Sequence, residues 1–432
     1  MRTKLLLATM NTLGALAGAA GAQISVGSDG SDGAFAFVGD AGDPNVMTID
    51  LGLAATSPWT TPSPVAGRGV YDSDAWAVVF KYTNVTVPTG KTVRFTNHPT
   101  RAPVVWLSQG DVIIDGEIDL DGADGHAWNA TPTWAEPGPG GFRGGLGRPA
   151  GAQQKQTAGF GPGGGFTGSS GTGSPAGFAA AGDTNNPFMP GPAYGTRKLE
   201  QLLGGSGGGD DIGANRPGSG AGGGAMLIAA DTALRVSGSI HADGGTHGAY
   251  ANGVTVGGGP GSGGALRLLA HEVEIVPGAL VRCLGRSIGY GGAYSTSSAG
   301  RIRIEANVHT FGTITNPVPS VGLPGPVFSP GQGRVRVASV DGVAVPIDPK
   351  AALLDFFADV GLVGAGTKNV TIVGVGIPDQ TTVELRVTDS LGEASVVTGT
   401  LTATGQPGET AATLQVDFPP SVVVLQARAL LP

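Results

Sequence analysis

Glycine constrains this chain more than any other feature, because 78 of its 432 residues are glycine. Residues 138–224 alone hold 30 glycines in 87 positions. A segment with so few side chains buries too little apolar surface to offset its ordering entropy, and such segments are commonly flexible. The alternative is a packed bundle of polyglycine-like left-handed helices, whose backbones approach closely because no side chain separates them. Phe142 and Phe178 lie inside the region and favour partial order, since a linker has no use for aromatic rings.

Outside this region, short apolar segments recur, and each is followed by a glycine hinge. We predict that the hinges lie at equivalent corners of stacked turns, where the backbone must bend tightly. One such turn cannot bury its apolar face alone, so turns of the same pattern stack and share a core. The irregular spacing of the hinges indicates loops of different length between the turns. The apolar segments are residues 103–108, 225–229, 265–270 and 301–306, and the hinges are Gly116, Gly238, Gly278 and Gly312.

The first 22 residues have the pattern of a secretory signal peptide. Arg2 and Lys4 precede an apolar run, and a small-residue cleavage site ends at Ala22. We therefore expect a secreted or cell-surface protein with no transmembrane segment in the mature chain. Cys283 is the single cysteine, so β-ladders and core packing must hold the fold together without an intramolecular disulfide. The net charge of −8 argues against nucleic acid as a partner.

Composition changes again near residue 340. Between residues 351 and 432 glycine falls to 9 of 82 positions, and apolar residues such as Val383, Leu385 and Val387 alternate with polar ones. This alternation predicts a small β-sandwich of immunoglobulin or fibronectin type. The predicted organisation is a signal peptide at 1–22, an N-terminal β cap at 23–82, a glycine-rich β-helix-like domain at 83–340 with the long insertion at 138–224, and a β-sandwich at 351–432.

The glycine-hinged turns followed by a small sandwich resemble uncharacterised secreted, glycine-rich bacterial proteins. The repeat region, residues 83–316, is similar to the right-handed parallel β-helices of pectate-lyase-like proteins. The resemblance implies an all-β fold, in which an irregular right-handed parallel β-helix-like coil with glycine-rich insertions precedes a small C-terminal β-sandwich. No pectate-lyase catalytic signature maps onto this chain, so the resemblance carries over no catalytic residue.

Acidic residues alternate with glycine in several turns, and Ca²⁺ prefers oxygen ligands of this kind. Aligning the hinges on either side of the insertion places Asp119 over His241 and Asp121 over Asp243. Two carboxylates so placed repel unless a cation or a donor lies between them. We therefore predict a weak Ca²⁺ site at Asp119, Asp121, Asp124 and Asp243 that joins the two ends of the insertion. Solvated turns are the alternative, because Asp-Gly is an ordinary turn sequence.

His241 and His247 flank Asp243 within one turn and form a conceivable zinc pair. This turn supplies no third strong ligand at the spacing of a zinc motif. Exposed turn histidines are therefore the favoured interpretation.

All five tryptophans lie between residues 59 and 134. Trp106 alternates with its neighbours in an apolar segment and is predicted to lie in the core. Trp128 and Trp134 lie in a polar loop, where their rings could stack on sugar faces as ligand-binding residues. Packing against the glycine-rich insertion is the favoured alternative.

Together these features predict a non-catalytic extracellular or cell-surface structural or adhesive protein, with polysaccharide or cell-envelope components as partners. The sequence has no P-loop, serine-hydrolase, zinc-protease or EF-hand motif. The alternative is a carbohydrate-active enzyme, a lyase or hydrolase, or a carbohydrate-binding protein that uses a β-helix groove. Carboxylates that converge beside exposed aromatic rings in one groove would favour this alternative, whereas a smooth surface would favour the structural function.

Overall fold

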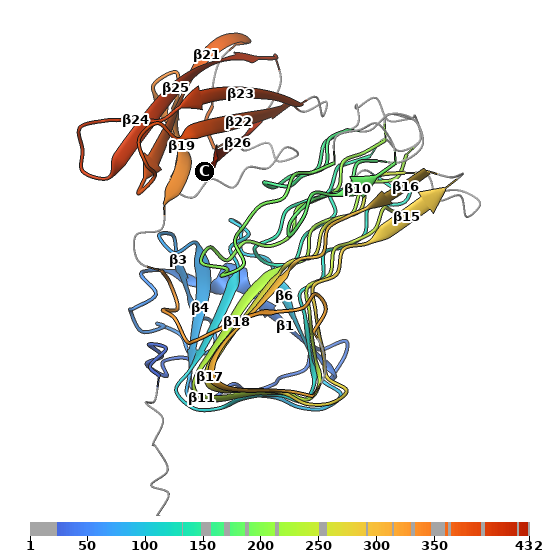
Figure 1. The fold of residues 1–432 in the computed structure, drawn as a ribbon, viewed down its shortest axis with the longest axis vertical. Coiled ribbons are helices and arrows are strands. Elements are labelled where there is room, and N and C mark those ends of the chain that lie inside the picture. The colour runs from blue at the N-terminus through green and yellow to red at the C-terminus, as the bar shows by residue number, and fades with distance from the viewer. Residues whose placement is uncertain are drawn as a thin grey trace, which may run out of the picture.

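The computed structural model of the chain is all-β, which confirms this part of the predicted fold (Figure 1). The predicted signal peptide, residues 1–22, lies outside the described residues. Within them the one helical element is the short 3-10 turn η1 (Leu51–Leu53). The described residues are 24–131, 133–147, 157–167, 173–185, 190–211, 216–249, 257–290, 293–312, 315–329, 333–346, 359–361, 364–389, 394–420 and 423–430.

The first part of the chain is a stack of parallel strands, called here the strand stack. The recurring apolar segments pair side by side in register, so that Ala225 faces Ala265 and Ala265 faces Arg301. Residues 103–108, 225–229, 265–270 and 301–306 are therefore equivalent, as predicted. The strands of this ladder, in spatial order, are β4 (Ala77–Tyr82), β7 (Val104–Ser108), β11 (Ala225–Val236), β13 (Ala265–Ile275), β17 (Arg301–Phe311) and β18 (Ser320–Gly322).

Two further parallel ladders complete each turn of the stack. Viewed as in Figure 1, the turns superpose on one another and give the lower part of the molecule a triangular outline. The sheets are mixed, because β3 (Val70–Asp72) runs antiparallel to β4. One ladder is β1 (Val46–Asp50), β6 (Thr92–Thr96), β9 (Glu117–Asp119), β12 (Ser239–His241) and β14 (Leu280–Arg282), and the other is β5 (Val85–Val87), β8 (Val112–Ile114) and the second half of β11. The edge strands beside β4 are β2 (Ala55–Thr56) and β3 (Val70–Asp72).

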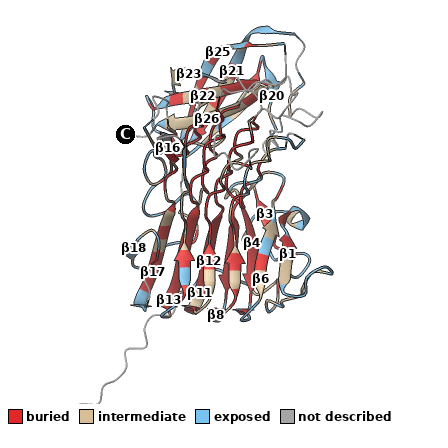
Figure 2. Ribbon diagram, turned by 90° about the vertical axis from the view of Figure 1, so that its right-hand side faces the viewer, coloured by how far each residue is buried: buried red, intermediate tan, exposed pale blue. Residues whose placement is uncertain are grey.

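Apolar side chains from successive turns stack inside the triangle and form one core. Phe80, Trp106 and Ile228 lie side by side on neighbouring strands, and each is fully buried. Trp106 is therefore a core residue, as predicted. Figure 2 shows this burial continuing from strand to strand through the stack. Full burial of one such side chain stabilises the fold by about 1.5–3 kcal/mol, so the shared core offsets the ordering of the turns.

The hinge glycines are equivalent only in part. Gly116 and Gly238 stack directly, and a Cβ on Gly238 would lie 1.9 Å from the carbonyl oxygen of Gly116. Gly278 is displaced, because four residues separate Ile275 from Leu280 whereas two separate Val236 from Ser239. The prediction of four equivalent corners is therefore wrong for Gly278. It is also wrong for Gly312, which directly follows Phe311 and therefore aligns with Val276. The two extra residues at the corner of Gly278 shift this glycine out of register with Gly238.

The glycine-rich segments extend from the strand stack as a tightly packed array, called here the glycine bundle (Figure 1). Its backbone hydrogen bonds connect three segments in a ring. The N–H of Gly205 donates to the carbonyl of Gly223, that of Gly223 to the carbonyl of Ser262, and that of Ser262 back to the first segment, at the carbonyl of Ser206. Each segment thus bonds neighbours in several directions, whereas a strand in a sheet bonds only two. These residues are therefore packed closely against one another and do not form a flexible linker. The bundle comprises residues 138–147, 157–167, 173–177, 204–211, 216–224, 242–248 and 257–264.

A small antiparallel sheet lies near the far end of the glycine bundle (Figure 1). Tyr294 lies on its central strand with 39% of its surface exposed. The sheet is called here the tip, and its strands are β10 (Asp183–Thr184), β16 (Ala293–Thr296) and β15 (Ser287–Tyr290).

The C-terminal part contains two antiparallel sheets that share a separate core. Val383, Leu385 and Val387 point into this core, as their alternation predicts. The first sheet begins with β19 at Arg334, earlier than the predicted boundary at residue 351, because β19 pairs with β21. The strands of the first sheet, in spatial order, are β20 (Val343–Ala344), β19 (Arg334–Val340), β21 (Gly366–Val375), β25 (Glu409–Phe418) and β24 (Thr402–Ala403). Those of the second sheet are β23 (Ala394–Thr400), β22 (Thr382–Asp389) and β26 (Val423–Leu430).

Arginines join this sheet pair to the glycine bundle. The guanidinium of Arg386 donates to the carbonyl of Gly159 at 3.0 Å and lies 5.0 Å from the centre of the Phe166 ring. Arg428 donates to the carbonyl of Pro162 at 2.8 Å. Burial, together with the charge of Arg428, lowers the pKa of Arg386 to about 10. A side chain on one part thus satisfies backbone carbonyls on the other.

We expect Arg386→Glu to separate the sheet pair from the bundle. A carboxylate cannot donate to the Gly159 carbonyl, and the loss of a hydrogen bond from a charged donor costs about 2 kcal/mol. Small-angle scattering should show a larger radius of gyration than for the wild type. The matched control is Arg336→Glu, which reverses an exposed charge on β19. An unchanged radius in Arg386→Glu would contradict the role assigned to this contact.

Candidate functional site

The two turns on either side of the insertion lie in direct contact, as the hinge alignment predicts. In the parallel pair β9–β12, Ile240 faces Ile118 and His241 faces Asp119. The N–H of Leu120 donates to the carbonyl of His241 at 2.9 Å, and the alignment continues past the strand ends. Because side chains alternate along a strand, Ile118 and Ile240 are buried in the core while their neighbours face outward. Residues far apart in sequence are thus brought together on one outer face.

Four outward side chains gather on this face and are called here the His241 cluster: Glu117, Asp119, Asp121 and His241. The imidazole Nε2 lies 3.0 Å from Oε1 of Glu117. Nδ1 lies 3.0 Å from Oδ1 of Asp121 and 3.6 Å from Oδ1 of Asp119. His241 is 9% exposed, so the prediction of an exposed turn histidine is wrong for this residue.

Backbone and side-chain donors fix the two aspartates. Oδ1 of Asp119 accepts the N–H of Asp121 at 3.0 Å, and Oδ2 pairs with Nε of Arg94 at 2.9 Å. Oδ1 of Asp121 accepts the N–H of Asp243 at 2.6 Å. The carboxylates are therefore held in place by the strands that carry them and by the adjacent turn.

The local charges shift the acidity of both partners. Burial opposes a charged imidazole, but contact with Asp121 and the charge of Asp119 outweigh it and raise the pKa of His241 to about 9. Burial likewise opposes ionisation of Asp121, but contact with His241 and the N–H of Asp243 outweigh it and lower its pKa. The cluster therefore favours one positive charge at its centre.

Asp243 faces away from this centre. Its carboxylate is fully buried, accepts the N–H of Leu284 at 2.7 Å and lies 3.0 Å from Nε of Arg282. Arg286 lies 3.6 Å from the same carboxylate. Burial and the charge of Asp121 raise the pKa of Asp243, and these donors oppose the rise. Asp243 therefore pairs with arginines, and its carboxylate does not form the expected pair with that of Asp121.

Asp124 also lies apart from the cluster. Its carboxylate accepts the N–H of Thr246 at 2.7 Å and links the ends of the two turns. Of the four predicted metal ligands, only Asp119 and Asp121 come together, and His241 joins them. Binding of Ca²⁺ stays a prediction.

Glu117 and the part played by His241 were not predicted from the sequence. Residues 117, 119 and 121 alternate along β9 and its continuation, and this spacing is a signal that their side chains share a face. The alignment also placed Asp119 over His241. The predicted zinc pair combined His241 only with His247 of its own turn, whereas its ligand partners lie on the preceding turn.

The predicted ligand-binding tryptophans are both half-buried. Trp134 packs edge-on against Phe160 of the glycine bundle, with ring centres 5.2 Å apart. The backbone N–H of Trp128 donates to Ala249 at 3.0 Å. Trp134 therefore has the packing contact that was the favoured alternative, and binding of sugar by either ring stays a prediction.

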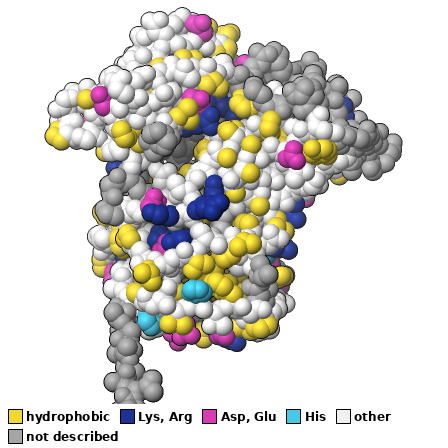
Figure 3. Space-filling view, viewed as in Figure 1, with side chains coloured by type: hydrophobic (Ala, Val, Ile, Leu, Met, Phe, Trp, Pro, Cys, Tyr) yellow, Lys and Arg dark blue, Asp and Glu magenta, His cyan; other side chains and the backbone are white. Residues whose placement is uncertain are grey.

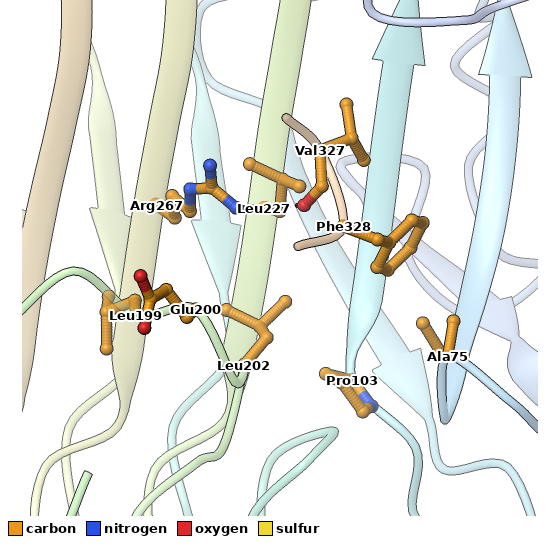
Figure 4. A pocket seen from close by; sticks show the side chains of 10 residues that line it. Ala75, Pro103, Leu199, Glu200, Leu202, Leu227, Arg267, Val327 and Phe328 are labelled. Carbon is orange, nitrogen blue, oxygen red and sulfur yellow. Dashed lines mark hydrogen bonds between the residues drawn. The ribbon is translucent and has the colours of Figure 1, made fainter. Parts of the chain in front are cut away.

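A small cavity lies beside β11 and β13, and it is lined mainly by apolar side chains such as Leu202, Leu227 and Phe328 (Figure 4). Its volume is about 20 Å³, which is room for a single water molecule. Arg267 at its edge donates to the carbonyl of Val327 at 2.8 Å and pairs with Glu305 at 2.8 Å. The arginine is occupied in fastening a surface segment to the sheet, and this cavity cannot hold a sugar.

Other acidic residues with buried carboxylates also serve the fold. Asp32 accepts the N–H groups of Gly67, Gly69 and Lys81, and Asp72 accepts that of Trp59. On the face shown in Figure 3, acidic side chains are scattered among basic, hydrophobic and neutral ones. Cys283 is fully buried, and burial raises the pKa of its thiol, which leaves it unreactive.

Comparison of the chain with family models, with curated proteins and with solved structures finds no match. No helix in the described part of the chain is long and apolar enough to cross a membrane.

Proposed function

We propose that this protein is exported and acts without catalysis as a structural or adhesive component outside the cell. The observation that carries the proposal is the glycine bundle, which projects from the strand stack and bears the tip near its far end (Figure 1). Backbone hydrogen bonds and close backbone contacts hold this projection together. Its stability therefore depends little on charged side chains. A rigid projection of this kind presents a binding surface at a distance from its base.

The proposal includes the finer architecture that the resemblance implies. The strand stack would be an irregular right-handed parallel β-helix, and the C-terminal sheet pair a small β-sandwich. The parallel ladders and the separate C-terminal core support this assignment. In this arrangement the stack is the base and the bundle is the arm.

The partner proposed is a polysaccharide or another cell-envelope component, bound at the tip. Tyr294 supports this choice, because an exposed aromatic ring has a flat apolar face that can lie against a sugar. The backbone N–H of Tyr294 is bonded to Asn185 at 2.8 Å, which fixes the strand that carries the ring. Nothing in the His241 cluster is required for this role.

The test is binding of the purified mature chain to a glycan array and to isolated envelope polysaccharides. We expect saturable binding without release of sugar fragments, and a loss of about tenfold in affinity for Tyr294→Ala, as for one aromatic contact. The matched control is Phe311→Ala, which removes an aromatic ring of equal 39% exposure on the strand stack. Release of shortened or unsaturated sugars would instead support the enzymatic alternative, and equal loss in both variants would remove the tip from the proposal.

A further inference from the structure

The contact between His241 and Glu117 determines which ring nitrogen carries the proton in the neutral imidazole. A carboxylate can only accept, so Nε2, 3.0 Å from Oε1 of Glu117, must be the donor. A metal ion would displace the second proton of the charged ring, and the neutral ring that remains carries a lone pair on Nδ1. A carboxylate that orients the second nitrogen of a histidine in this way is the usual neighbour of a metal-binding imidazole.

Nδ1 of His241 is buried and makes no hydrogen bond. It nevertheless lies 3.0 Å from Oδ1 of Asp121 and 3.6 Å from Oδ1 of Asp119. Ligand atoms about 2.0–2.2 Å from one small cation lie at about these separations from each other. One ligand atom from each of the three residues falls within 4.8 Å of the others. The three atoms therefore have the spacing of a shared ligand set without the geometry of a hydrogen bond.

We propose that Asp119, Asp121 and His241 bind one divalent cation of the zinc type, with water completing the coordination. A nitrogen ligand beside two carboxylates suits Zn²⁺ and related transition metals, whereas Ca²⁺ selects oxygen alone. Asp243 is excluded from the ligand set, because Arg282 and Arg286 hold its carboxylate. This metal site is independent of the function proposed above.

The placement of the ligands gives the cation a structural role. Asp119 and Asp121 precede the long insertion, and His241 follows it on the adjacent turn. A metal bound to all three would tie together the two turns from which the glycine bundle extends. Binding to the folded state alone raises its stability by mass action.

The test is titration of the metal-free mature chain with Zn²⁺, and with Co²⁺ as a spectroscopic probe. We expect one metal per chain, a visible Co²⁺ absorption band and a rise of a few degrees in melting temperature. His241→Gln and Asp119→Asn should each lose the band while keeping a cooperative melt without metal. The matched control Asp124→Asn removes a carboxylate on the same turn but outside the ligand set, and it should bind metal as the wild type does.

Glu117→Gln tests whether Glu117 only orients the imidazole of His241 and is not itself a metal ligand. This variant should still bind one metal, with affinity 10–100-fold lower, because the amide orients the imidazole less well than the carboxylate. If His241→Gln does not fold, Asp119→Asn and Glu117→Gln decide the question, since both side chains are more exposed. Failure of the wild type to bind Zn²⁺ or Co²⁺ at 1:1 stoichiometry would overturn the proposal. So would undiminished binding in Asp119→Asn, or stabilisation by Ca²⁺ but not by Zn²⁺.

Discussion

Gly222→Ala should disrupt the glycine bundle and lower the free energy of unfolding by about 4 kcal/mol, near the upper limit for a single substitution. The new Cβ would lie 1.9 Å from the carbonyl oxygen of Gly205 and 2.1 Å from its carbonyl carbon. Both atoms belong to the backbone, so no rotamer change can relieve the clash. The segments must move apart, and that movement breaks the bond from Phe142 N–H to Gly205, one of several worth about 1 kcal/mol each.

Gly42→Ala is the matched control for this substitution. A Cβ at Gly42 meets no atom within 4 Å, and the residue has no positive φ, so we expect a change within about 0.5 kcal/mol. Urea unfolding followed by circular dichroism measures both variants. If Gly222→Ala is as stable as Gly42→Ala, then the close packing described for the bundle is incorrect.

The repeated turns were predictable because their pattern is local. Each strand carries apolar residues at alternate positions, and the hinge between them is short, so Ile118 and Ile240 could be aligned from sequence alone. Gly278 could not be placed, because the sequence does not reveal that its own corner is two residues longer than that of Gly238. The start of the C-terminal sheet at Arg334 was missed for a similar reason. β19 is half-exposed, and its partner β21 lies more than 25 residues later.

The sequence allows a packed glycine array as an alternative to a flexible segment, but it does not decide between them. Apolar periodicity reports which face of a strand is buried, and a run of glycines has no faces. The decision between a flexible linker and a packed array depends on whether many such segments meet. That depends on pairings such as Gly220 with Gly259, which join distant parts of the insertion and of the chain beyond it.

The candidate site was predictable to the level of the register and no further. Alignment of the hinges brought Asp119 beside His241, which the structure confirms. The direction of each side chain could not be inferred. Asp243 looked equivalent to Asp121, but two arginines on the next turns, Arg282 and Arg286, draw its carboxylate away. An alignment of two turns does not include the side chains of a third, so these arginine contacts could be found only from the structure.

Asp210 should make the stability of the glycine bundle fall as pH rises from about 4 to about 6. Its carboxylate is fully buried and accepts the N–H groups of Gly147 at 2.6 Å and Thr157 at 2.9 Å, together with the hydroxyl of Ser219. Burial outweighs these bonds and raises its pKa from 3.8 to about 6. The folded state therefore holds the proton more tightly than the unfolded state, and this contribution is present below pH 4 and lost above pH 6.

The measurement is urea unfolding of the wild type and of Asp210→Asn at several pH values between 4 and 7. A difference of about 2 between the folded and unfolded pKa corresponds to about 3 kcal/mol. Relative to the variant, the wild type should lose about this much stability across the range, because asparagine does not titrate. Subtracting the variant also removes the effect of the other carboxylates. Asp417→Asn, at an exposed position on β25, is the control and should follow the wild type. Parallel curves for wild type and Asp210→Asn would show that the buried carboxylate ionises as easily in the fold as in the unfolded chain.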